Sequence, residues 1–91
     1  MRYNAEVVPD KFTRIARAME LSSDTPEAVF TWIEESLRAT GLPRNLSEIG
    51  VKVSDIPALV EVALKDVCHP LGPRAVNHKQ FAALFQEALN R

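Results

Sequence analysis

Residues 42–74 read LPRNLSEIGVKVSDIPALVEVALKDVCHPLGPR and decide the fold of this 91-residue chain. Apolar side chains in this stretch recur at steps of three and four residues, which places them on one face of a helix. This apolar stripe consists of Ile56, Leu59, Val60, Ala63, Leu64 and Val67. Ser54 is expected to cap the start of the helix, and the prolines and glycine of residues 70–73 are expected to stop it. The stretch therefore predicts one amphipathic helix that the other elements cover.

Three further helices and one short helical turn are expected around that helix. An early proline or an N-cap side chain marks their starts, at Pro9, Thr25, Asn45 and Asn77. Their inward faces are expected to carry Phe12, Ile15, Ala16 and Met19, then Val29, Phe30, Ile33 and Leu37, then Leu46 and Ile49, then Phe81, Leu84, Phe85, Ala88 and Leu89. Only residues 51–53 alternate as a strand would, and they are too few. The predicted fold class is all-α, a small bundle of about four helices plus a short helical turn.

Composition excludes several classes of protein. The chain has 11 basic and 12 acidic residues, a net charge of −1, and no basic face of the kind that binds nucleic acid. No apolar run approaches the roughly 20 residues that cross a bilayer, and the first residues do not resemble a signal peptide. Cys68 is the single cysteine, which fits a reducing compartment. We expect a soluble cytoplasmic protein without nucleic-acid or membrane partners.

Catalytic motifs are missing from the sequence. It has no glycine-rich phosphate loop, no HExxH, no paired cysteines and no GxSxG. His69 and His78 lack a partner at the spacing that places two ligands on one helix face, so no metal, cofactor-binding or catalytic residue is predicted. Cys68 follows a helix end, where the dipole disfavours a thiolate, and burial as a small apolar side chain is the main alternative. Trp32 is expected at the boundary of core and solvent, or in a ligand cleft or interface.

Four pieces of the sequence resemble the carboxy-terminal part of the iron-containing (group III) alcohol dehydrogenases. They are MRYN at residues 1–4, GLPRNLSEIGV at residues 41–51, DIPALVEVALKDVC at residues 55–68 and GPR at residues 72–74, in the order and spacing of the family. One departure is Gly72, because the family's triplet usually has asparagine before Pro-Arg. The pieces extend over nearly the whole chain, so the resemblance is specific.

The resemblance implies an NAD(P)-dependent oxidoreductase that interconverts a primary alcohol and an aldehyde by hydride transfer. In this family an amino-terminal domain binds the nicotinamide, and a helical domain holds Fe²⁺ or another divalent metal through one aspartate and three histidines. Those histidines precede the position of residues 1–4, and neither His69 nor His78 matches a ligand. Cys68 corresponds to a position near the substrate cleft, which implies a weak substrate-lining role.

Residues 1–91 are therefore expected to be the C-terminal helical subdomain of a longer two-domain enzyme. They would form part of the dehydroquinate synthase-like helical domain. The expected partners are the amino-terminal nucleotide-binding domain and the metal-binding helices, and self-association is a further expectation. The chain alone is expected to be inactive, because it lacks both the cofactor loop and the metal ligands.

Two alternatives remain open at the level of the sequence. One is an oxidoreductase of the maleylacetate reductase type, which shares the helical domain and an MRYN-like start. The other is a free-standing helical interaction module that uses Trp32 and the loop around Pro70 as its partner surface.

Overall fold

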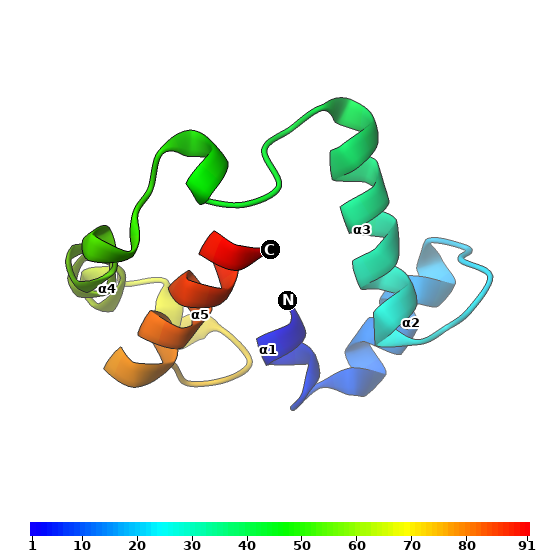
Figure 1. Cartoon of the computed structure of the whole chain (residues 1–91). Coiled ribbons are helices and arrows are strands. Elements are labelled where there is room, and N and C mark those ends of the chain that lie inside the picture. The colour runs from blue at the N-terminus through cyan, green and yellow to red at the C-terminus, as the bar shows by residue number, and fades with distance from the viewer. The chain divides into compact units, whose positions relative to one another are not determined.

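Helices, joined by turns and irregular loops, form the chain in the computed structural model, which describes residues 1–91 (Figure 1). The α-helices are α1 (Arg2–Ala5), α2 (Pro9–Ala18), α3 (Pro26–Thr40), α4 (Ile56–Lys65) and α5 (His78–Asn90). Three 3₁₀ turns are η1 (Ser47–Ile49), η2 (Val53–Asp55) and η3 (His69–Leu71). There is no strand, so the all-α prediction is confirmed. None of the helices is long and apolar enough to cross a membrane.

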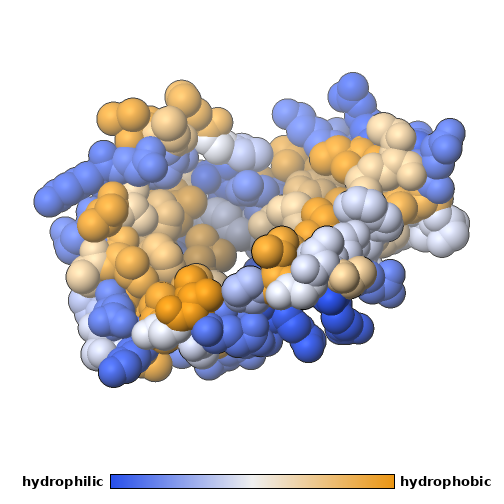
Figure 2. Space-filling view, turned by 90° about the horizontal axis from the view of Figure 1, so that it is seen from above, coloured by the Kyte–Doolittle hydropathy of each residue, from blue (hydrophilic) through white to orange (hydrophobic).

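The elements group into two compact units, unit 1 (Met1–Leu42) and unit 2 (Pro43–Arg91). Unit 1 contains α1 to α3, and unit 2 contains the three 3₁₀ turns with α4 and α5. Each unit has its own small cluster of buried apolar side chains. Many apolar residues nevertheless remain on the surface beside polar ones, as the orange and blue areas of Figure 2 show.

In unit 1, α2 and α3 pack around an aromatic pair. The rings of Phe12 and Phe30 meet edge to face, with centroids 5.6 Å apart and an interplanar angle of 61°. The buried cluster consists of Ala5, Phe12, Ala16, Val29 and Phe30. Ile15 was expected to face inwards, and this is wrong, because its side chain is 42% exposed on the outer side of α2. The sequence also gave no sign of α1, a single helical turn that buries Ala5.

The predicted start of α3 at Thr25 is confirmed. The Thr25 hydroxyl oxygen accepts a hydrogen bond from the Ala28 N–H at 3.3 Å, and Pro26 occupies the first turn. Gly41 ends the helix with φ of 70°, a left-handed conformation that glycine adopts without a Cβ penalty. Local signals in the sequence therefore fix the longest helix of the chain.

In unit 2, α4 packs against α5 around Ile56, Val60 and Leu89. The start of α4 differs from the prediction, because Ser54 lies inside η2 and makes no cap. The carboxylate of Asp55 accepts the Lys52 N–H at 2.8 Å instead, and this bond folds residues 53–55 into the 3₁₀ turn that leads into α4.

The end of α4 also differs from the prediction. The helix stops at Lys65, because Asp66 has extended backbone angles and its carboxylate accepts the Cys68 N–H at 2.7 Å. The expected inward position of Val67 is therefore wrong, and its side chain is 83% exposed. The apolar stripe ends with Leu64, which packs against the unit 2 cluster.

The turn before α4 is capped by Asn45, as predicted. Asn45 Oδ1 accepts the Glu48 N–H at 2.9 Å, and Gly50 closes the turn with φ of 90°. The Glu48 carboxylate reaches back along the chain and accepts the N–H of Arg44 at 2.9 Å. Ile49 was expected to face inwards but is 59% exposed, because the turn is held by hydrogen bonds and not by that side chain.

The same turn caps the carboxyl end of α5, whose last carbonyl groups have no partner within the helix. The Leu46 N–H donates to the Ala88 carbonyl at 3.0 Å, and the Ser47 hydroxyl donates to the Leu89 carbonyl at 2.9 Å. The other end of α5 begins at Asn77, as predicted, and the side chains of Asn77 and Gln80 form a capping box there through two reciprocal bonds of 2.9 Å. Polar contacts thus hold both ends of α5.

Candidate functional site

The chain's own side chains form no metal or cofactor site. No three of its histidine, cysteine, aspartate and glutamate side chains lie close enough together to hold a metal ion. His78 Nε2 lies 3.5 Å from Glu61 Oε1, with both side chains more than half exposed, and His69 is engaged elsewhere. The residues present therefore do not fit the iron that the resemblance implies. They do not fit a nicotinamide either, because no glycine-rich loop joins a strand to a helix.

The most sharply defined surface feature is a turn of residues 67–71, which we name the Cys68 turn. It follows α4 directly and contains η3. On one side Asp66 binds the backbone N–H of Cys68. On the other side the Nε2–H of His69 donates to the Leu64 carbonyl at 3.2 Å, the tautomer that a carbonyl partner requires.

The ring of His69 also ties the turn to α5. It meets Phe81 edge to face, with centroids 5.3 Å apart and an interplanar angle of 81°. Its Nδ1 atom is buried and makes no hydrogen bond. His69 is therefore a clamp between α4 and α5, and sequence reasoning missed this role. Nothing in the sequence signalled it, because the clamp depends on how α5 returns to α4.

Cys68 is exposed at the outer side of this turn. The alternative that Cys68 is a buried apolar side chain is therefore wrong. The physical reason is the early end of α4, since the chain leaves the helix before Cys68 could reach the interior. Val67 and Leu71, in the same turn, each have 83% of their surface exposed.

Unit 1 has two hollows on its surface. One hollow of about 470 Å³ has lining residues that all lie on α2, which makes it a depression of one helix surface; they are Lys11, Arg14, Ile15 and Ala18. A second of about 350 Å³ lies among the first turns of α1, α2 and α3.

Trp32 is 48% exposed, which fits a boundary position; its role in a cleft or interface stays a prediction.

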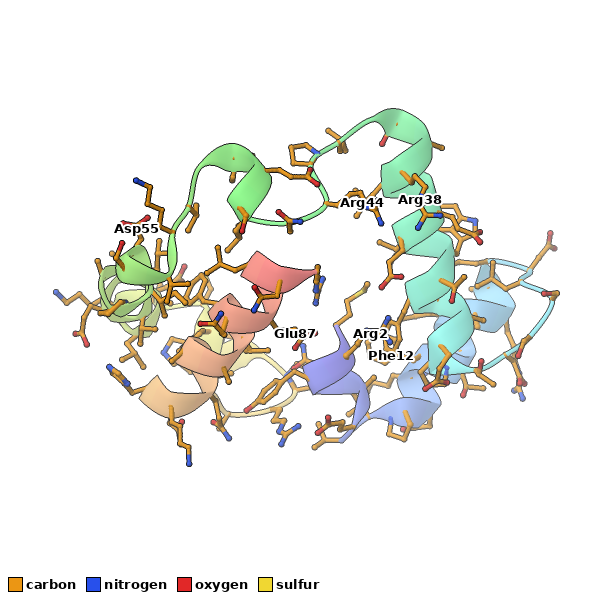
Figure 3. The ribbon with its side chains drawn as sticks, in the orientation of Figure 1. Arg2, Phe12, Arg38, Arg44, Asp55 and Glu87 are labelled. Atoms are coloured by element: carbon orange, nitrogen blue, oxygen red, sulfur yellow. The ribbon has the colours of Figure 1, made fainter.

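Residues 1–4, the MRYN piece, have a structural role in unit 1. The guanidinium of Arg2 lies over the ring of Phe30, 4.7 Å from its centroid, and forms an ion pair of 2.8 Å with Glu34. Figure 3 shows Arg2 on α1 and Phe12 on α2. Arg2 thus pins α1 to α3, a second role that sequence reasoning missed.

Gly72 does not need to be glycine. Its φ of −70° and ψ of 163° are the extended angles that the following Pro73 favours. A Cβ atom placed there would lie 3.5 Å from the His69 carbonyl oxygen, an ordinary contact. The asparagine that the family usually carries at this position is therefore compatible with the backbone.

Fold and site together define a small all-α protein in which no three His, Cys, Asp or Glu side chains could hold a metal ion. In the comparison with family models, the model "Fe-containing alcohol dehydrogenase family, C-terminal" matches residues 1–89. The chain belongs to the iron-containing alcohol dehydrogenase family.

Individual relatives show how much of such an enzyme the chain represents. It is 36% identical over 98 residues to lactaldehyde reductase of Escherichia coli (strain K12), covering 97% of this chain and 25% of that enzyme. It is 37% identical over 93 residues to 1,3-propanediol dehydrogenase of Citrobacter freundii, covering 96% and 24%. It is 34% identical over 74 residues to alcohol dehydrogenase 4 of Saccharomyces cerevisiae (strain ATCC 204508 / S288c), covering 81% and 19%. The chain spans about a quarter of the length of the first two relatives.

Proposed function

We propose that residues 1–91 are the C-terminal helical subdomain of an iron-dependent, NAD(P)-linked alcohol dehydrogenase. The full-length enzyme interconverts a primary alcohol and an aldehyde by hydride transfer. The observation that carries this proposal is the family match over residues 1–89, which extends across both units. The names of the similar enzymes, lactaldehyde reductase and 1,3-propanediol dehydrogenase, support the class of reaction.

The proposal assigns the nicotinamide and the metal to the upstream part of the enzyme, meaning the portion that precedes the matched region in the relatives. No three His, Cys, Asp or Glu side chains of this chain lie close enough together to hold a metal ion. This chain contributes helical packing and, through the Cys68 turn, one wall of the substrate cleft. We propose a cytoplasmic location, in keeping with the free thiol of Cys68.

Exposed apolar side chains support a role for the upstream part as a partner. Those with more than two fifths of their surface exposed are Met1, Val7, Ile15, Trp32, Leu42, Ile49, Val53, Val62, Val67 and Leu71. Removing apolar surface from water stabilises an assembly by about 25 cal/mol per Å². The isolated chain should therefore associate with itself, and it should not oxidise NADH with short aldehydes and ferrous iron. Sedimentation and an absorbance assay test these two expectations.

A chimera tests the proposed function. The carboxy-terminal quarter of the Escherichia coli lactaldehyde reductase is replaced by this chain, and the control is the same enzyme ending before the replaced quarter. The chimera should reduce lactaldehyde with a nicotinamide cofactor and iron at a rate far above that of the control. A folded chimera no more active than the control would contradict the proposal.

The substrate-lining role of Cys68 is tested in the same chimera. A Cys68→Met substitution adds bulk at an exposed position without a charge. If Cys68 faces the substrate, kcat/KM should change from one aldehyde to the next while the KM for the cofactor stays constant. An unchanged aldehyde profile would remove Cys68 from the substrate cleft.

A further inference from the structure

We draw no further inference here: the strongest candidate, the basic and apolar hollow on the surface of α2 lined by Lys11, Arg14, Ile15 and Ala18, carries none because nothing in the structure shows what covers it.

Discussion

Unit 1 and unit 2 are stabilised in different ways. Unit 1 has five buried apolar residues around an edge-to-face aromatic pair, and Arg2 adds a contact to the same ring system. Unit 2 has three buried apolar residues, and side-chain and backbone hydrogen bonds fix the start of α4 and both ends of α5. Unit 1 therefore buries more of its apolar side chains completely, whereas unit 2 relies more on hydrogen bonds at helix ends and turns.

The contrast bears on function, because a turn that is held by hydrogen bonds does not need to bury its apolar side chains. In unit 1 the side chains of Phe12 and Phe30 are both buried in the core. In unit 2, Asp66 and His69 hold the backbone of the Cys68 turn, so Val67 and Leu71 remain exposed. The proposed substrate contact lies in the unit whose shape depends least on apolar burial.

The largest expected effect is on unit 1. Phe12→Ala removes one ring of the aromatic pair from a buried site and should lower the free energy of unfolding by about 3–5 kcal/mol. Urea denaturation followed by circular dichroism measures this loss. The control Val7→Ala, at a half-exposed position, should change it by no more than about 0.5 kcal/mol. A small effect of Phe12→Ala would mean that apolar packing does not define unit 1.

A smaller effect is expected in unit 2. Ser47→Ala removes the part-buried hydrogen bond to the Leu89 carbonyl and should cost about 1 kcal/mol. Ser54→Ala is the matched control, because Ser54 is exposed and does not cap α4, and its effect should stay within about 0.5 kcal/mol. Equal effects of the two substitutions in urea denaturation would contradict the role assigned to the turn before α4.

Two glycines of unit 2 are expected to have effects of opposite sign. Gly72→Ala should stabilise the chain by about 0.4–1 kcal/mol. The folded backbone at Gly72 suits alanine, and alanine lowers the conformational entropy of the unfolded chain. Gly50→Ala should destabilise it by about 1–2 kcal/mol, because its φ of 90° disfavours a Cβ atom. Thermal unfolding measures the Tm of each variant. Tm shifts of the same sign would show that the backbone at Gly50 or at Gly72 is described wrongly.

Local signals made much of this fold predictable from the sequence. Thr25, Gly41 and Asn77 act within a few residues along the chain, and each does what its residue type indicates. The predictions for Ser54 and Val67 failed because the carboxylates of Asp55 and Asp66 bind nearby backbone N–H groups and move both ends of α4.

The site was less predictable than the fold. Cys68 was identified from the family resemblance, but its exposure depends on the early end of α4. The clamp formed by His69 depends on Phe81, twelve residues further on, and a pattern of spacing cannot reveal such a contact. The same holds for Arg2, whose partners Phe30 and Glu34 lie in another helix.

We propose that this chain completes a family enzyme through packing and a substrate-facing turn, without supplying metal ligands. The most direct test is the iron content of the chimera after both histidines of the chain are replaced, by His69→Gln and His78→Gln. Iron should be bound in the same stoichiometry as in the unsubstituted chimera, with altered aldehyde preference because the His69 clamp is weakened. Loss of iron from the folded double variant would contradict it.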